Sequence, residues 1–207
     1  MDAVLRGCAL GLKRTLDLLV AGGLLIGLSP VFVAIALTIK LTSTGPVFYR
    51  WQVIGRHGRP FVGYKFRSMV VNADSLKAQL AGANEMSGPV FKIRADPRIT
   101  PVGRLLRKYS LDELPQLWSV VKNDMSLVGP RPPLRTEYAQ FTEWHKRKLA
   151  VKPGITCLWQ ISGRNNIRNF DEWVALDLEY IDNWSLALDL KILLQTIPAV
   201  IQARGAA

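Results

Sequence analysis

Cysteine, histidine and, over one long stretch, acidic side chains are scarce in this 207-residue sequence, and each scarcity excludes a class of protein or site. Two cysteines, Cys8 and Cys157, are too few for a disulfide framework and are compatible with a reducing compartment. Cys157 lies among apolar residues, which predicts an unreactive core side chain. His57 and His145 have no second ligand at the spacing of a zinc finger or of a helical ligand pair. We therefore predict no zinc site.

Acidic residues are scarce between residues 40 and 107. This segment contains twelve Lys and Arg against three acidic residues, a net of +9 out of the formal +11 of the whole chain. The three acidic residues are Asp74, Glu85 and Asp96. So positive a segment favours a nucleic acid, an anionic membrane surface or a phosphorylated small molecule as the partner.

Charged residues are absent altogether from the 22 residues 18–39, which read LLVAGGLLIGLSPVFVAIALTI. One continuous helix of this length would cross a bilayer core. However, Ser29 and Pro30 lie in the middle of the run, where proline removes a backbone hydrogen bond and bends the helix. Basic residues, which favour the cytoplasmic side, flank both ends: Arg6, Lys13 and Arg14 before the run, then Lys40, Arg50, Arg56 and Arg59 after it. These observations favour a re-entrant helix that enters one leaflet and returns; a kinked span and a buried core helix are the alternatives.

Hydrophobic patterns in the rest of the chain predict short strands and helices. Residues 46–71 contain β-branched and aromatic runs split by glycine, which predicts a strand pair with a turn near residues 55–60. Thr100-Pro101 is a typical helix start. Further helices are predicted over residues 72–81, 111–122, 170–183 and 186–202. The last of these is amphipathic, and its apolar side fits either a membrane interface or the core.

Two carboxylates stand side by side in KYSLDELPQLW, residues 108–118. Ser110 and Glu113 match the S-x-x-E capping box of a helix start, and Pro115 then falls in the first turn, where a missing N–H costs least. The functional alternative is that Asp112 is a nucleophile at the positive end of this helix, which helps to keep it ionised. Adjacent carboxylates repel unless a cation sits with them, and Mg²⁺ takes one or two carboxylates together with substrate phosphate oxygens.

Basic residues that suit phosphate binding surround this pair in the sequence. Arginine binds phosphate through two parallel hydrogen bonds, and lysine binds it as a point charge. The candidates are Lys65, Arg67, Arg94, Arg98, Arg107, Arg131 and Arg164. The alternative for each is a solvated side chain, and Asp124, in NDMSLVGPRP, fits a simple turn equally well.

Five stretches together carry a resemblance to a known family. They are FVGYKFRSM, DPRITPVGRLLRKYSLDELPQLWSVV, NDMSLVGPRP, VKPGITCLWQISGRN and LDLEYIDNWSLALDLKILL. In this order they resemble the bacterial sugar transferases, the monotopic phosphoglycosyl transferases that start exopolysaccharide, capsule or O-antigen synthesis on polyprenyl phosphate. The resemblance runs from about Lys13 to Arg204.

The resemblance implies transfer of a sugar-1-phosphate from a UDP-sugar to undecaprenyl phosphate, with release of UMP. It implies that Asp112 is the nucleophile and Glu113 its partner carboxylate, with Mg²⁺ between these carboxylates and the pyrophosphate. Four basic residues match positions associated with phosphate or nucleotide binding: Lys65, Arg107, Arg131 and Arg164. Ser29-Pro30 matches the helix-breaking pair of the family, which favours the re-entrant alternative.

The implied fold is α+β. A re-entrant membrane helix (residues 1–44), broken at Ser29-Pro30, precedes a catalytic domain (residues 45–207) with a short β-hairpin and amphipathic interfacial helices. The implied location is the cytoplasmic face of the bacterial inner membrane, in contact with phospholipid. UDP-galactose and UDP-glucose are the favoured donors, while N-acetylated and deoxygenated sugars and a homodimer stay open.

Two residues depart from the family pattern. Asn123 stands where glycine usually precedes Asp-Met-Ser, and Cys157 stands where glycine often follows Gly-Ile-Thr. The rival function is a non-enzymatic membrane-anchored module whose basic stretch binds anionic lipid or nucleic acid. That function leaves DELPQ and GPRP unexplained, so we expect no nucleic-acid partner.

Overall fold

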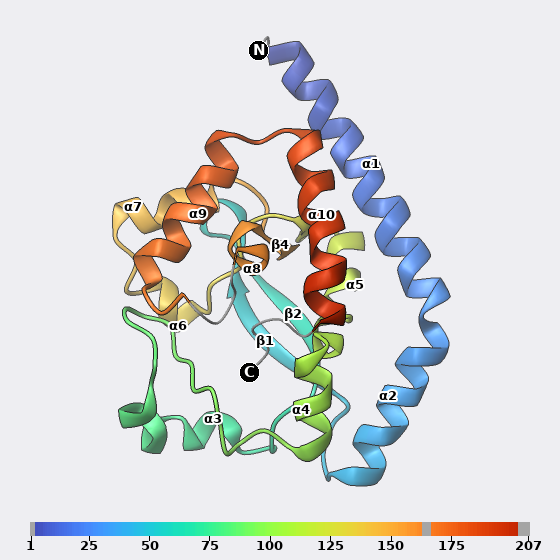
Figure 1. The fold of residues 1–207 in the computed structure, drawn as a ribbon, viewed down its shortest axis with the longest axis vertical. Helices are drawn as coiled ribbons and strands as arrows, with labels where there is room; N and C mark the ends of the chain where they lie inside the picture. Colours follow the sequence, from blue (N-terminus) through green and yellow to red (C-terminus); the bar gives the residue numbers. More distant parts are fainter. Residues whose placement is uncertain (1–2, 163–166, 203–207) are drawn as a thin grey trace.

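A long bent pair of helices runs along one side of a mixed α+β body in the computed structural model, which describes residues 3–162 and 167–202 (Figure 1). The α+β class agrees with the prediction. Helix α1 spans Ala3–Gly27 and α2 spans Ser29–Thr42. Most of the large apolar side chains on this pair that the structure describes are exposed, Leu19, Ile26 and Leu41 among them.

The break between α1 and α2 falls where the sequence predicts it. Pro30 occupies the first turn of α2, and the Ser29 hydroxyl donates a hydrogen bond to the carbonyl of Ile26 at 2.7 Å. The segments Gly7–Gly27 and Ser29–Thr42 meet at a bend of 58°. Among the described residues, neither helix alone has the length and apolar composition of a membrane span, whereas the bent pair taken together does.

The predicted strand pair is present as an antiparallel hairpin. Strands β1 (Phe48–Ile54) and β2 (Pro60–Phe66) are joined through the short 3₁₀ turn η1 (Arg56–Gly58). His57 and Gly58 both have positive φ there, 57° and 76°, which closes the tight connection. In the register of the hairpin, Trp51 lies opposite Gly63.

A second, parallel strand pair joins two of the sequence motifs. Strand β3 (Ser126–Val128) leads into GPRP, and it pairs with β4 (Gly154–Thr156) of VKPGIT. A Cβ on Gly129 would lie 2.5 Å from the carbonyl oxygen of Lys152. The two motifs therefore run side by side with their backbones in close contact, which is why glycine is needed on both sides.

Helices cover this small framework. Those within residues 73–83, 101–121, 170–182 and 186–201 agree with the predicted positions, whereas the short helical segments between residues 135 and 161 were not predicted. Thr100 caps α4 by accepting a hydrogen bond from the Gly103 amide at 2.9 Å. The helical elements after the hairpin are α3 (Ala73–Leu76), η2 (Ala78–Ala83), α4 (Pro101–Lys108), η3 (Leu111–Glu113), α5 (Gln116–Val121), α6 (Arg135–Tyr138), α7 (Glu143–Lys146), η4 (Arg147–Ala150), α8 (Leu158–Ile161), α9 (Phe170–Asp182) and α10 (Leu186–Ile201).

The capping box predicted at Ser110 is not formed. Ser110 adopts a left-handed backbone conformation with φ 53°, and its side chain makes no capping hydrogen bond. The carboxylate of Glu113 instead accepts a hydrogen bond from Lys65. The helix itself still starts here, because η3 and α5 are linked by hydrogen bonds from the Leu114 amide to Leu111 and from the Leu117 amide to Leu114.

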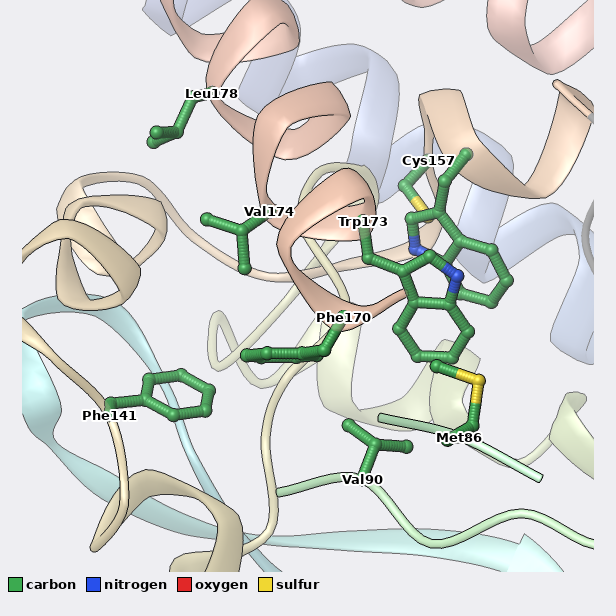
Figure 2. Packing of buried hydrophobic residues seen from close by; sticks show 9 residues of the cluster. Met86, Val90, Phe141, Cys157, Phe170, Trp173, Val174 and Leu178 are labelled. Carbon is green, nitrogen blue, oxygen red and sulfur yellow. The ribbon is translucent and has the colours of Figure 1, made fainter. Parts of the chain in front are cut away.

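Three clusters of buried apolar residues hold the body together. One lies under α9 and includes Phe141, Trp173 and Val174 (Figure 2). Cys157 is buried in the same cluster, which confirms its predicted core position. A second cluster joins Ala21 of α1 to α5, β3 and α10, and a third joins α2 to β2 and α4.

Candidate active site

A cavity of about 860 Å³ opens between the hairpin, the segment 90–98, η3, Arg131 and the two helices α8 and α9. Its wall includes four predicted site residues whose charges act on one another: Asp112, Glu113, Lys65 and Arg107. The fold thus brings together residues from β2, α4 and η3 that are up to 48 positions apart in the chain.

Asp112 is buried at the edge of this cavity, with only 7% of its surface exposed. The apolar neighbours Leu111 and Leu114 pack on the cluster formed by α2, β2 and α4, which fixes the turn that carries the carboxylate. Burial and the neighbouring charge of Glu113 raise the pKa of Asp112 from 3.8 to about 6, against the opposing effects of Lys65 and Arg107. A backbone hydrogen bond at Asp112 also lowers the pKa, in the direction expected of a helix start, but burial outweighs it.

Glu113 and Lys65 form the closest charged contact in this part of the cavity. Lys65 Nζ lies 2.6 Å from Glu113 Oε1 and 4.3 Å from the centre of the Trp51 ring. The aromatic face stabilises the ammonium group at the position from which it meets the carboxylate. Gly63 makes room for this arrangement, because a Cβ there would lie 2.3 Å from Trp51 Nε1.

Arg107 reaches the cavity from the last turn of α4. Its Nε donates a hydrogen bond to the Ser68 hydroxyl at 3.0 Å, and its charge acts on Asp112. Ser68 is itself fixed, because its carbonyl accepts from the Thr100 amide at 3.1 Å. Thr100, the N-cap of the same helix, therefore helps to fix the direction of the Arg107 guanidinium group through Ser68.

Arg131 lies over a second part of the cavity wall, made by a stacked tryptophan pair. The rings of Trp159 and Trp173 are 4.2 Å apart and inclined by 18°. The Arg131 guanidinium carbon lies 5.9 Å, and Lys92 Nζ 5.8 Å, from the centre of the Trp173 ring. The two cations make this wall attractive to an anion, while burial and the charge of Arg131 lower the pKa of Lys92 to about 8.

Arg67 lines the cavity, but its guanidinium group is engaged elsewhere. It donates hydrogen bonds to the carbonyl oxygens of Ser43 and Thr44 and to the Ser43 hydroxyl. These residues follow α2, so Arg67 ties the exit of the bent helix pair to β2. A phosphate-binding role for Arg67 stays a prediction.

Two other residues from the sequence analysis, Asp124 and Arg98, fall outside the core of the site, and a third is not described. Asp124 pairs with Lys122 at 2.7 Å and does not line this cavity, in agreement with the turn alternative. Arg98 lines the cavity but is held by Asp96 in a buried ion pair of 2.6 Å. Arg164 lies outside the described residues.

The donor set fits a single Mg²⁺ ion bound jointly with substrate. Among the described residues, no group of three or more His, Cys, Asp or Glu side chains is arranged to hold a metal. Mg²⁺ needs only one or two carboxylates when phosphate oxygens complete its shell. Asp112 and Glu113 provide two on one wall, and the part of the chain that the structure describes adds no third such side chain to them.

Sequence reasoning missed the aromatic half of the site. Lys92, Trp51, Trp159 and Trp173 line the cavity although none belongs to a carboxylate or arginine pattern. Trp159 lies in the CLWQ part of a motif that the sequence analysis recognised, so this motif was the available signal for one of them. The position of Lys92 in a loop before DPRIT gave no such signal.

Comparisons with known proteins agree with this geometry. A family model described as bacterial sugar transferase matches residues 8–203. The chain is similar to the galactosyl transferase CpsE of Streptococcus agalactiae, with 50% identity over 196 residues that cover 94% of this chain and 43% of the relative. It is also similar to the undecaprenyl-phosphate galactose phosphotransferase of Salmonella typhimurium, with 44% identity over 94% of this chain and 41% of the relative.

A shorter relative is covered almost completely. The exopolysaccharide production protein ExoY of Sinorhizobium fredii is 42% identical over 93% of this chain and 87% of its own length. By contrast, the chain spans less than half the length of the other two relatives.

Proposed function

The chain belongs to the bacterial sugar transferase family, and from this premise we propose that it transfers a hexose-1-phosphate from a UDP-sugar to undecaprenyl phosphate and releases UMP. The product is undecaprenyl-diphospho-sugar, the lipid-linked start of an exopolysaccharide, capsule or O-antigen. Galactose is the favoured sugar because two of the relatives described above carry galactose in their names, and glucose is the second choice.

The observation that carries this proposal is a buried carboxylate placed among cations at a cavity. Asp112 is the nucleophile, and its raised pKa marks a carboxylate that gains from neighbouring positive charge. Lys65 and Arg107, which line the same cavity, supply such charge. A cation bound with the substrate would oppose this rise in pKa and favour the ionised carboxylate that attack requires.

The reaction proceeds in two displacements at one phosphorus atom. An oxygen of Asp112 attacks the phosphorus that bears the sugar, the bond to the bridging oxygen breaks, and UMP leaves with the electron pair. The aspartyl phosphosugar that results is a mixed anhydride. A phosphate oxygen of the lipid then attacks the same phosphorus, and the carboxylate of Asp112 leaves. Lys65, Arg107 and Arg131 bind the charged oxygens and orient them for both displacements.

Mg²⁺ completes the proposal as the cation of the substrate pyrophosphate. Asp112 and Glu113 would hold it, and when bound it withdraws charge from the phosphate oxygens. Glu113 serves either as metal ligand or as base, and its contact with Lys65 is compatible with both.

We further propose that residues 1–44 form a re-entrant membrane segment and residues 45–207 a catalytic domain at the cytoplasmic face of the inner membrane. The 58° bend at Ser29-Pro30 and the exposed apolar side chains of α1 and α2 support this arrangement. On α10, the exposed Leu190, Leu194 and Ile197 support contact with the membrane interface.

The activity is tested by supplying the purified chain with undecaprenyl phosphate and a panel of UDP-sugars. We expect UMP release with UDP-galactose or UDP-glucose, complete loss of turnover in excess chelator, and recovery on addition of Mg²⁺. No UMP from any sugar would contradict the function, and full activity in chelator would remove the metal from it.

A further inference from the structure

Three charged residues of α1 contact the body of the protein. The sequence places Lys13 and Arg14 in the positive flank of the apolar run, where a role toward the membrane surface is expected. In the structure, Lys13, Arg14 and the buried Asp17 instead bond to backbone or side-chain groups of α5, β3 and α10. Charged groups are commonly buried only when they are paired in this way.

Arg14 closes the end of the helix that begins at the catalytic pair. Its two terminal nitrogens donate to the carbonyl oxygens of Val120 at 2.7 Å and Val121 at 3.1 Å. These carbonyls belong to the last turn of α5, where a positive charge is favourable, and the Val120 carbonyl also accepts a hydrogen bond from the Asn123 amide at 3.0 Å. Since hydrogen bonds link η3 to α5, Arg14 and Asp112 stand at opposite ends of one helical segment.

Asp17 and Lys13 hold β3. Asp17 Oδ1 accepts a hydrogen bond from the Leu127 amide at 3.0 Å, and Lys13 Nζ donates to the Val128 carbonyl at 3.1 Å. Lys13 also pairs with Asp189 of α10 at 2.6 Å. Both bonded groups belong to β3, which pairs with β4 and runs directly into Gly129-Pro130-Arg131.

We infer that α1 positions the active site as well as anchoring the chain: Arg14 positions the Asp112-Glu113 pair through α5, and Asp17 positions Arg131 through β3. Both are positioning residues, since neither lines the cavity. The inference rests on the proposed function, in which Asp112 performs the chemistry and Arg131 binds the donor. It predicts that Arg14 and Asp17, less than one helical turn apart, affect different steps: Arg14 the chemical step and Asp17 the binding of the donor.

The test uses the first half-reaction, in which the full-length enzyme receives UDP-sugar without lipid and one UMP is released per active site. Arg14→Met keeps the apolar stem and removes the donors. Asp17→Leu keeps the branched shape of the side chain and removes the acceptor, whereas Asp17→Asn keeps an acceptor oxygen. Thr15→Ala is the matched control, because the exposed Thr15 hydroxyl bonds only to Gly11 of its own helix.

We expect Arg14→Met to lower the limiting rate of the UMP burst about tenfold at an unchanged half-saturating UDP-sugar concentration, because small displacements of a nucleophile are costly. Asp17→Leu should raise the half-saturating concentration about tenfold with little change in the limiting rate. Asp17→Asn and Thr15→Ala should match the wild type. Loss of folded enzyme lowers only the amplitude of the burst, so a merely structural role leaves both quantities unchanged.

Amide hydrogen exchange gives a readout that needs no activity. Asp17→Leu should accelerate exchange of the Leu127 amide, and Asp17→Asn should not. Unchanged exchange at Leu127, or the same kinetic change in Arg14→Met and Asp17→Leu, overturns the inference. A wild type that exchanges as expected but releases no UMP contradicts the proposed function instead.

Discussion

At the scale of single residues, Asp112 combines burial with a task that requires charge. The native protein holds the Asp112 proton up to about pH 6, whereas the ordinary pKa of 3.8 means that the unfolded chain releases it earlier. The native state thus binds more protons than the unfolded state between about pH 4 and pH 6. The free energy of unfolding therefore falls as pH rises through this window. Catalysis requires the ionised form of Asp112, and burying that charge lowers the free energy of unfolding.

The replacement Asp112→Asn should consequently stabilise the protein above pH 6. A shift of this size corresponds to roughly 2–3 kcal/mol in the free energy of unfolding, and the gain should disappear toward pH 4. Chemical unfolding of wild type and variant in metal-free buffer at pH 4 and pH 7.5 measures it. Asp124→Asn, outside the cavity, is the control. An equal stability difference at both pH values would show that Asp112 has an ordinary pKa.

The two departures from the family pattern are explained residue by residue. Asn123 has φ 75°, a conformation in which glycine is favoured and asparagine is the best tolerated of the other residues. Its side chain also accepts a hydrogen bond from Lys152. Cys157 has φ −154°, an extended conformation that any residue adopts, and its side chain fills the core.

At the scale of elements, the paired strands that carry GPRP and VKPGIT allow the structural role of Gly129 to be separated from the functional role of Arg131. In Gly129→Ala the new Cβ would press on the backbone of Lys152, and backbone cannot rotate away. We expect a loss of about 2–3 kcal/mol in the free energy of unfolding. Arg131→Ala, two residues on, should keep its circular dichroism spectrum and lose about 100-fold in kcat/KM. An unfolded Arg131→Ala would assign GPRP to structure alone.

The elements differ in how far the sequence could predict them. The hairpin, the helix start at Thr100-Pro101 and the break at Ser29-Pro30 were predictable because proline, glycine and alternating apolar residues act locally. Strands β3 and β4 have only three residues each, too few to show a period, and they depend on a contact between distant motifs. The capping box is not formed: Ser110 has a left-handed backbone conformation, and Glu113 bonds to Lys65, 48 positions away, a contact that local sequence does not reveal.

The site was predictable to a similar degree. Asp112, Glu113, Lys65 and Arg107 were found as charged residues within recognised motifs, and the fold gathers them at one cavity wall. The stacked tryptophans were missed because aromatic residues are more often core than ligand contacts. Lys13 and Arg14 were assigned to the membrane flank because positive charges beside an apolar run usually are.

At the scale of the whole molecule, the proposed re-entrant segment has both ends of the bent helix pair on one side of the membrane. Single cysteines replacing Ala3 and the exposed Arg59, in a Cys8→Ser/Cys157→Ala background, should both be shielded from a membrane-impermeant thiol reagent in intact cells. Both should react after lysis, which serves as the control. Labelling at position 3 alone in intact cells would mean that the helix crosses the bilayer.

The central claim is that Asp112 becomes covalently bound to the sugar phosphate. Two substrates as different as a soluble UDP-sugar and a membrane lipid can then use one set of cations in turn, rather than together. Enzyme given UDP-sugar labelled in the sugar, without lipid, should retain about one label per active site after denaturation, release UMP, and pass the label to undecaprenyl phosphate when undenatured enzyme receives it. Asp112→Asn should retain none. A label that survives in Asp112→Asn, or UMP release that requires lipid to be present, would contradict the account and favour direct transfer in a ternary complex.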